Sequence, residues 1–420
     1  MKITDVRTAV VQGNYDWTYI RVYTDRGIVG LGESFFAPGL TSIVQELAGV
    51  IVDEDARDIG RLFRKMQRAA SGAGSVAGIV YNAISGIEAA LWDALGKYLE
   101  APVYQLLGGK QRGRVKVYAD CHAGREWPPY YNPVLQGGMV PWAAKLTPAP
   151  RDNHEIYSPE AYAERARQAV AKGFRALKFD LDVPNPYQEE ADSRRISKAE
   201  AAFMKSLAES AIAAAGPGVE VGFDLHWRYD LASALLVAKL LEPLGVAWLE
   251  DPVPPEASGA LRDLSSATST PISTGENLYL LEGFLTLLEH RAVRIVSPDL
   301  QKAGGLLEGW RIASTADAYL VGFAPHNISS PIGTIASAHV CAVARNFVAL
   351  EFHGQDVPFW NDLALLPDRS HVIVDGYIPL TDAPGIGVEL NEDLARRYAK
   401  PGEPFFGEVV SEETKAASAE

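Results

Sequence analysis

Hydrophobic and polar positions alternate with a period of two near the start of the chain and then change to a helical period. Residues 3–11 and 19–23 are alternating apolar runs, residues 24–27 have a turn-type sequence, and a third run follows. These runs predict a small antiparallel meander. Over residues 40–99 apolar positions recur every three to four residues, which predicts helices. Residues 1–114 are therefore expected to form one α+β unit.

From residue 115 the pattern changes to short apolar runs that alternate with helical stretches. Such alternation is typical of repeated βα units around a parallel sheet. Eight runs have this character: residues 115–121, 176–182, 219–226, 247–251, 271–276, 294–299, 320–326 and 347–353. Residues 115–370 are therefore expected to close into a (β/α)8 barrel of the α/β class. Residues 371–420 return to strand-like pieces, and we expect them to pack on the amino-terminal unit.

Composition and charge narrow the class of protein. The 420 residues are 47% hydrophobic and 22% charged, which is ordinary for a folded globular protein with more than one core. No apolar run reaches the roughly 20 residues that span a bilayer, and we expect a cytoplasmic protein without membrane attachment. The net charge of −14, without a basic cluster, argues against nucleic-acid binding. The two cysteines, Cys121 and Cys341, do not suit a disulfide framework or a cysteine zinc site.

Charged side chains gather at the carboxyl ends of the predicted barrel strands. Strands buried on both faces should be apolar, so these charges stand out from their surroundings. The residues concerned are Lys178, Asp180, Asp224, His226, Glu250, Asp251, Glu276, Asp299, His326, Glu351 and His353. Because barrel active sites lie at this end of the strands, these residues are candidates for catalysis and metal binding.

Three of these residues, Asp224, Glu250 and Glu276, follow one another at intervals of 26 residues on consecutive predicted strands. Hard cations such as Mg²⁺ bind carboxylate oxygens and keep positions for water and substrate. A single carboxylate at a strand end commonly caps a helix or pairs with lysine, but three that converge would repel one another without a cation. We therefore predict one Mg²⁺ per active site on these three residues.

Asp299 and His326 end adjacent predicted strands. A carboxylate beside an imidazole fixes the tautomer and raises the basicity of the ring, so this pair is a candidate general base. The alternative for His326 is a histidine whose hydrogen bonds are satisfied inside the core. Lys178 is an ammonium in an apolar strand, which suits either a base or a group that binds a carboxylate. Its alternative is an ion pair with Asp180 or Glu250.

Eight short segments, in order along the chain, resemble the mandelate racemase subgroup of the enolase superfamily. They are Gly32-Glu33, Ala90-Leu91-Trp92-Asp93, Leu106-Leu107-Gly108-Gly109, Trp248-Leu249-Glu250-Asp251-Pro252, Gly275-Glu276-Asn277, Pro298-Asp299, Gly304-Gly305 and Pro384-Gly385-Ile386-Gly387. The resemblance implies that residues 1–114 are a capping domain over a modified (β/α)8 TIM barrel. It also implies Mg²⁺ on the three carboxylates, a base dyad of Asp299 and His326, and Glu351 as a hydrogen-bond donor to a substrate oxygen. The alternative for Glu351 is an ion pair with Lys178.

The resemblance also implies a reaction, in which a proton is removed beside a carboxylate to give an enediolate that a cation and an ammonium stabilise. Mandelate racemase has Lys-x-Lys on the second barrel strand, whereas this chain has Lys178-Phe179-Asp180, so a second base opposite His326 is not evident. The Lys-x-Asp form and Asp224-Leu225-His226 resemble gluconate, galactonate and mannonate dehydratases, where the histidine is a candidate acid for the departing hydroxyl.

These features predict a hydro-lyase that dehydrates an aldonate or aldarate to a 2-keto-3-deoxy acid. The alternative on the same scaffold is a racemase, an epimerase or a cycloisomerase. A non-catalytic binding or structural protein is a third hypothesis, and the presence of every candidate ligand and base argues against it.

Substrate contacts are expected from loops on the catalytic face. The stretch between Cys121 and Ser158 follows the first barrel strand and is rich in aromatic residues and prolines. Loops of this length are commonly functional, and packing against a neighbouring subunit is an equal alternative for this one. The substrate-binding candidates are His122, Arg125, Trp127, Asn14 and Trp360, the last of which has closure of the eighth loop as its alternative. We expect a homo-oligomer that acts on a small acid sugar.

Overall fold

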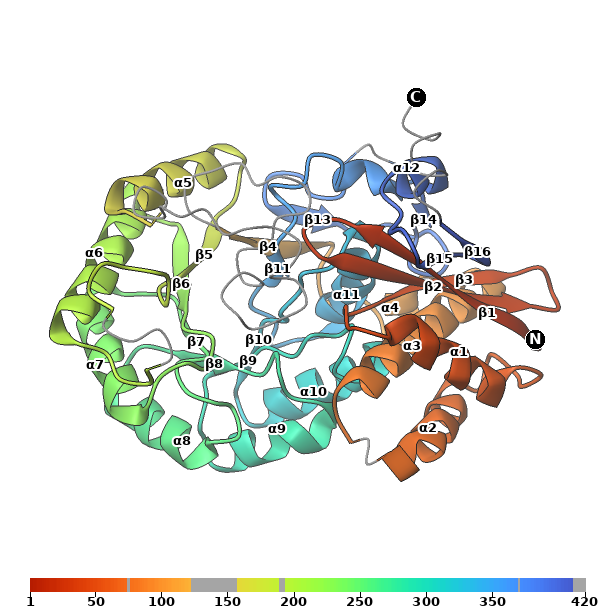
Figure 1. The fold of residues 1–420 in the computed structure, drawn as a ribbon, viewed down its shortest axis with the longest axis horizontal. Helices are drawn as coiled ribbons and strands as arrows, with labels where there is room; N and C mark the ends of the chain where they lie inside the picture. Colours follow the sequence, from red (N-terminus) through yellow and green to blue (C-terminus); the bar gives the residue numbers. More distant parts are fainter. Residues whose placement is uncertain (74–75, 122–156, 189–192, 369–370, 411–420) are drawn as a thin grey trace.

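The computed structural model describes residues 1–73, 76–121, 157–188, 193–368 and 371–410, in which a sheet with three helices lies beside a ring of strands and helices (Figure 1). The sheet of the capping domain begins with the predicted meander, formed by β1 (Ile3–Gln12), β2 (Asp16–Thr24) and β3 (Val29–Ser34). Its strand order is β16-β15-β1-β2-β3, because the carboxyl-terminal strands β15 (Pro404–Phe405) and β16 (Glu408–Val409) add to its edge. The two ends of the chain therefore share one sheet.

Helices α1 (Leu40–Ile51) and α3 (Ile79–Tyr98) cover the sheet of the capping domain, and α2 (Ile59–Ala70) packs on these two helices. Helix α3 lies so close to β3 that a Cβ atom at Gly32 would be only 2.3 Å from the carbonyl oxygen of Gly86. Glycine at this position allows the helix backbone to pack directly on the strand. The short helix α4 (Val103–Leu106) then leads into the ring.

The ring is a barrel of eight parallel strands in the order β10-β9-β8-β7-β6-β5-β4-β11. Each strand falls within one of the eight predicted apolar runs. They are β4 (Arg114–Asp120, which begins one residue early), β5 (Ala176–Asp180), β6 (Glu220–Asp224), β7 (Leu249–Glu250), β8 (Ile272–Thr274), β9 (Ile295–Val296), β10 (Gly322–Phe323) and β11 (Leu350–Phe352). A parallel bridge between Phe323 and Phe347 closes the ring. The predicted α/β barrel is confirmed.

Seven α-helices follow the first seven barrel strands in turn. They are α5 (Pro159–Ala171), α6 (Lys198–Ala215), α7 (Leu231–Leu241), α8 (Ser258–Ala267), α9 (Leu280–Glu289), α10 (Leu306–Ala318) and α11 (Pro331–Val343). None of the helices in the described residues is long and apolar enough to cross a membrane.

The eighth unit differs from an ideal barrel in the part that the structure describes. After β11 the chain forms a 3₁₀ turn, η5 (Asn361–Leu363), and the strand β12 (Ala364–Leu365) instead of an α-helix. Strand β12 pairs with β14 (Glu389–Leu390), and β13 (Tyr377–Pro379) pairs antiparallel with the start of β4. The chain thus leaves the barrel at this point and returns to the capping domain.

Two buried carboxylates of the capping domain bind the amino ends of barrel helices. Glu88 on α3 accepts hydrogen bonds from the backbone N–H groups of Leu306 (2.7 Å) and Leu307 (3.1 Å), where α10 begins. Glu33 at the end of β3 accepts from the N–H groups of Ser330 (2.9 Å) and Gly333 (2.8 Å), at the start of α11. The first N–H groups of a helix lack partners within the helix, so these carboxylates tie the two parts together.

A third carboxylate, Asp93 on α3, joins the two ends of the chain. Its oxygens accept from the backbone N–H groups of Leu31 and Ile386, both at 2.8 Å, and it pairs with Lys97 at 2.8 Å. Glu33, Glu88 and Asp93 are called the interface carboxylates below. Together they fix the capping domain over the barrel mouth.

Candidate active site

Three carboxylates converge at the carboxyl ends of consecutive barrel strands. Asp224 ends β6, Glu250 ends β7 and lies beside Asp224 in register, and Glu276 follows β8. Their exposed fractions are 1%, 2% and 8%, and one oxygen from each lies within 4.8 Å of the others. These three residues, called the rim carboxylates, are the set that the sequence spacing predicted as a metal site.

Lys178 lies on β5 beside the rim carboxylates and is saturated with negative charge. Its Nζ atom lies 3.0 Å from Asp224, 3.1 Å from Glu250 and 2.8 Å from Glu351. Burial alone would lower the pKa of Lys178, but Glu250 and Glu351 beside it raise that pKa well above its ordinary value. Lys178 is therefore a fixed cation of the site in this arrangement.

The charge balance of the rim fits a bound divalent cation. Burial first, and then the neighbouring charges of Asp224 and Glu351, raise the pKa of Glu250 well above its usual range, although Lys178 opposes this. One ammonium therefore does not offset the three rim carboxylates and Glu351. Buried carboxylate oxygens that converge in this way are the ligands that Mg²⁺ prefers. The residues present thus suit a divalent metal ion.

His326 and Asp299 form the expected hydrogen-bonded pair. The His326 Nδ1 atom lies 2.7 Å from Oδ2 of Asp299, whose other oxygen accepts from the backbone N–H of Gln301. The contact with Asp299 places a ring proton on Nδ1. The other ring nitrogen, Nε2, faces Glu276 at 3.3 Å. Burial alone would lower the pKa of His326, but Glu276, Glu351 and Asp299 raise it to about 10. Positive charge beside Glu276 would lower that pKa toward the range of a general base.

His226 faces the site from the opposite side of the barrel, because β6 and β10 lie four strands apart in the ring. Its Nδ1 atom lies 2.9 Å from Asp182, and its Nε2 atom lies 3.9 Å from Asp180. Burial would lower its pKa, but Asp224, Asp182 and Asp180 raise it well above the ordinary value. A protonated imidazole in this position is suited to donate a proton.

The two histidines, Lys178 and residues of the rim line one cavity of about 400 Å³. Tyr15, Phe35 and Phe36 of the capping domain line it too, together with Ile328 of the barrel. Phe36 stacks between Tyr15 and Phe35, with ring centroids 4.9 and 4.8 Å apart. An aromatic wall over buried charges strengthens electrostatic interactions inside the cavity, because it keeps the local dielectric low.

Two charged residues that sequence reasoning did not assign, Asp120 and Lys302, also line the cavity, together with the strand-end candidate His353. Asp120 ends β4, and its Oδ2 atom lies 3.0 Å from Nε2 of His353. The rule that located the other charges applies equally to Asp120, since it ends the first apolar run. Lys302 lies three residues beyond Asp299 in the next loop, outside any strand end, so that rule does not reach it.

The remaining predicted residues take other positions. Asn14 does not line the cavity. Its amide nitrogen contacts Nδ1 (2.7 Å) and the carbonyl oxygen (3.0 Å) of His353, so it orients that ring. Trp360 is buried with its Nε1–H donating to the carbonyl oxygen of Ser329, so it supports the wall from behind. The substrate contacts predicted for Asn14 and Trp360 stay predictions. Glu351 is fully buried in the cavity wall. The candidates His122, Arg125 and Trp127 lie outside the described residues.

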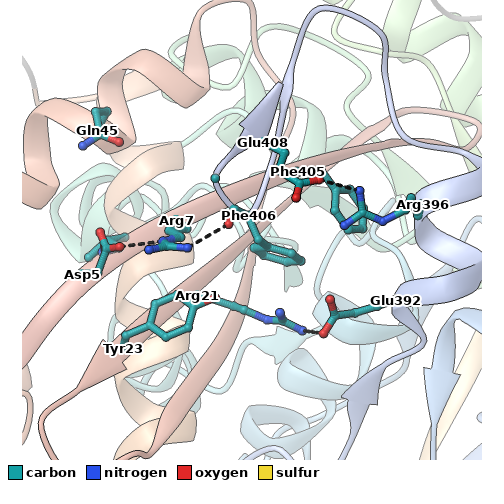
Figure 2. A pocket seen from close by; sticks show the side chains of 12 residues that line it. Asp5, Arg7, Arg21, Tyr23, Gln45, Glu392, Arg396, Phe405, Phe406 and Glu408 are labelled. Carbon is teal, nitrogen blue, oxygen red and sulfur yellow. Dashed lines mark hydrogen bonds and ion pairs between the residues drawn. The ribbon is translucent and has the colours of Figure 1, made fainter. Parts of the chain in front are cut away.

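A larger hollow of about 600 Å³ lies over strands β1, β2 and β15 of the capping sheet (Figure 2). Its charged groups pair with one another: Arg7 with Asp5 at 2.6 Å, Arg21 with Glu392 at 2.7 Å and Arg396 with Glu408 at 3.0 Å. Because these charges are satisfied by the protein itself, the smaller cavity with its excess of carboxylates is the better candidate for chemistry.

Comparisons with known proteins agree with this geometry. Residues 6–108 match the model of the mandelate racemase / muconate lactonizing enzyme N-terminal domain, and residues 161–394 match that of the enolase C-terminal domain-like family. A D-xylonate dehydratase of Haloferax volcanii is 40% identical over 97% of this chain and 91% of its own. A D-galactonate dehydratase of Xanthomonas oryzae pv. oryzae is 32% identical over 94% of each chain. A solved mandelate racemase/muconate lactonizing enzyme-like protein from Rubrobacter xylanophilus superposes with a TM-score of 0.88 at 41% identity, covering 97% and 99% of the two chains.

Proposed function

Since this chain belongs to the mandelate racemase subgroup of the enolase superfamily, we propose that it is a Mg²⁺-dependent hydro-lyase that dehydrates a sugar acid to a 2-keto-3-deoxy acid. The relatives named D-xylonate and D-galactonate dehydratase cover nearly the whole chain and support an aldonate as the substrate. The observation that carries the proposal is the placement of His326 and His226 on opposite sides of one cavity, beside the rim carboxylates.

His326 is the proposed base. Its Nε2 atom takes the proton from the carbon next to the substrate carboxylate, and Asp299 holds the ring and stabilises the imidazolium that forms. The electron pair of the broken C–H bond gives an enediolate. A divalent cation on the rim carboxylates would supply positive charge beside the substrate carboxylate, where negative charge develops. Lys178 stabilises the same region as a fixed ammonium.

His226 is the proposed acid. The electron pair of the enediolate returns to form a C=C bond and expels the hydroxyl on the neighbouring carbon, which leaves as water with the proton of His226. Asp182 and Asp180 keep this imidazole protonated. The enol product then tautomerises to the 2-keto-3-deoxy acid. A base and an acid on opposite sides of the cavity suit an elimination in which proton and hydroxyl leave from opposite faces.

We propose that the distal hydroxyls of the substrate bind on the side of the cavity opposite Glu276, where Asp120 and His353 lie. Strand β4 lies four strands from β8 in the ring, so Asp120 is across the barrel mouth from Glu276. The Asn14 amide donates to Nδ1 of His353, which leaves the ring proton on Nε2 to bind Asp120. The side-chain oxygens of Asp120 are acceptors, which suits hydroxyl donors.

A racemase or an epimerase is less well supported than elimination. Such a reaction needs a second base opposite His326, and the candidates there are Lys178 and His226. Lys178 is paired with three carboxylates. His226 has Asp182 and Asp180 beside it, which lie outside the rim and would still favour its protonated form with a cation bound there, whereas Glu276, the first carboxylate that raises the pKa of His326, belongs to the rim. Both groups are therefore cations rather than bases in this site.

Incubation of the enzyme with Mg²⁺ and a panel of aldonates and aldarates, followed by detection of 2-keto acids, tests the reaction. The proposal predicts a 2-keto-3-deoxy product from at least one acid. Inversion at the α-carbon without loss of water would support the racemase or epimerase alternative instead. In D₂O, the His226→Ala variant should still exchange the α-hydrogen while elimination stops. Elimination at the normal rate in that variant would remove His226 from the mechanism.

Two further expectations belong to this proposal. We infer a homo-oligomer, which light scattering tests, and a role in substrate choice for residues 122–157. Truncation of residues 125–142 should raise KM or change the preferred acid. Unaltered kinetics with a changed oligomeric state would assign the segment to a subunit interface.

A further inference from the structure

We propose that Lys302, and not only the metal site, binds the carboxylate of the substrate. This inference rests on the proposed function and extends it to a residue outside the predicted site. Lys302 follows β9 and is 4% exposed, and it lines the same cavity as His326 and Glu276. It is therefore a buried cation in direct reach of a ligand in the cavity.

The partners of Lys302 are neutral. Its Nζ atom donates to Oδ1 of Asn277 at 3.0 Å and lies 4.1 Å from the centre of the Phe35 ring. Among the residues that the structure describes, it forms no ion pair. One amide oxygen and one aromatic face offset only part of the cost of burying an ammonium, so the site is suited to an anion.

Lys178 provides the contrast within the same cavity. It pairs with Asp224, Glu250 and Glu351, whereas Lys302 has no carboxylate among its described partners. A substrate anion can therefore approach Lys302 without first displacing a protein carboxylate, which is not the case for Lys178. An ammonium already shared by three carboxylates attracts a further anion weakly, because their charges repel it.

The position of Lys302 is consistent with the proposed base. Its backbone N–H donates to the carbonyl oxygen of Asp299 at 3.2 Å, so the loop that carries Lys302 also carries the partner of His326. Asn277 donates to Glu276 at 3.3 Å, which joins Lys302 to the rim through one amide. A carboxylate bound between Lys302 and the rim would thus lie beside the loop that holds the partner of His326, in the cavity that His326 also lines.

The test uses glycolate, which has the 2-hydroxy carboxylate end of a sugar acid but no polyol chain, and glycolamide, its neutral analogue. Both are titrated into the Mg²⁺-loaded full chain. In Lys302→Met the affinity for glycolate should fall by about tenfold or more, while the affinities for glycolamide and Mg²⁺ stay unchanged. Lys302→Arg should retain part of the preference for glycolate. Lys172→Met, which removes an exposed lysine of the barrel, is the matched control.

Unchanged glycolate affinity in Lys302→Met, or equal losses for glycolate and glycolamide, would overturn the proposal. Because glycolate has only the carboxylate end of a sugar acid, the first result would show that Lys302 does not bind the substrate carboxylate. Lys302→Gln repeats the comparison if the methionine variant does not fold. Because glycolate binding does not depend on turnover, a Lys302-dependent preference with no dehydration of any sugar acid would sustain this proposal and refute the proposed function.

Discussion

The rim carboxylates and the interface carboxylates are equally buried, but they differ in what neutralises them. Glu33 and Glu88 each accept two backbone N–H groups and one side-chain donor, all from fixed positions. Asp224 and Glu250 each accept one neutral N–H group, from the backbone of His226 and the indole of Trp248, but the rim carboxylates otherwise face Lys178, His326 and one another. A buried carboxylate that the backbone satisfies holds the structure together, whereas a set with too few donors requires a ligand from outside.

The largest expected difference between the two groups is in turnover. Glu250→Gln should lower kcat more than about a thousandfold, because it removes one of three metal ligands. The free energy of unfolding of the metal-free protein should change by less than about 1 kcal/mol, since the variant loses a repulsion as well as an ion pair. Glu256→Gln, on an exposed loop of the same face, is the control. Steady-state kinetics measures kcat, and urea unfolding measures the free energy of unfolding. Normal turnover in Glu250→Gln would remove the rim carboxylates from the mechanism.

A somewhat smaller effect is expected at the base. His326→Asn should lower kcat by about a hundred- to ten-thousandfold while the affinity for Mg²⁺ stays nearly intact. Asp299→Asn should lose less, since it removes only the group that orients the ring. Isothermal titration with Mg²⁺ and exchange of the substrate α-hydrogen in D₂O separate the two properties. Exchange at the wild-type rate in His326→Asn would assign the base elsewhere.

The interface carboxylates should show the reverse pattern. Glu88→Gln replaces one acceptor oxygen with a donor that faces the N–H groups at the start of α10, so it should lower the free energy of unfolding by about 1–3 kcal/mol. Its kcat should change less than about tenfold, because Glu88 does not line the cavity. The same substitution at Glu289, exposed on α9, is the control. Wild-type stability with lost turnover would mean that the distinction between the two groups is wrong.

The location of the barrel and its rim could be predicted because both depend on local patterns. Apolar runs define the strands, and parallel strands bring their carboxyl ends to one rim, so Asp224, Glu250 and Glu276 converge without knowledge of packing. The interface carboxylates depend instead on contacts between residues far apart. Glu88 binds a helix start 218 residues away, and Glu33 one 297 residues away. The resemblance pointed to the segments of Glu33 and Asp93, but the sequence contained no sign of what they bind.

Lys302 and the eighth barrel unit show other limits of sequence reading. Lys302 follows a strand end by several residues, and only the packing of Phe35 and Asn277 around it reveals a buried cation. Directly after β11 the described residues form η5 and β12 rather than an α-helix, and the next α-helix, α12 (Glu392–Arg397), comes only after β12 has paired with β14, about 25 residues further along. Such pairing is a tertiary feature that periodicity does not encode.

The smallest predicted difference is in the pH dependence of stability. Burial raises the pKa of Glu33 and that of Glu88 to about 7, although the donors around each oppose this. The folded state then binds protons more tightly than the unfolded chain between pH 4.5 and about 7. The contribution of each group to the free energy of unfolding is largest below pH 4.5 and is lost as the pH rises through about 7. Between these pH values the free energy of unfolding falls with a slope on the order of 1.4 kcal/mol per pH unit. Urea unfolding of Glu88→Gln across this window should show a shallower slope than the wild type, and an identical slope would contradict the assignment.

The most direct test of the account is the dependence of turnover on metal, because the rim carboxylates have no sufficient partner within the described protein. The protein is exhaustively chelated with EDTA, assayed on the acid sugar that it dehydrates, and titrated with Mg²⁺. We predict that activity is lost on chelation and returns in proportion to one Mg²⁺ bound per chain, with no binding at this site in Glu250→Gln. Full activity in the chelated enzyme would contradict it.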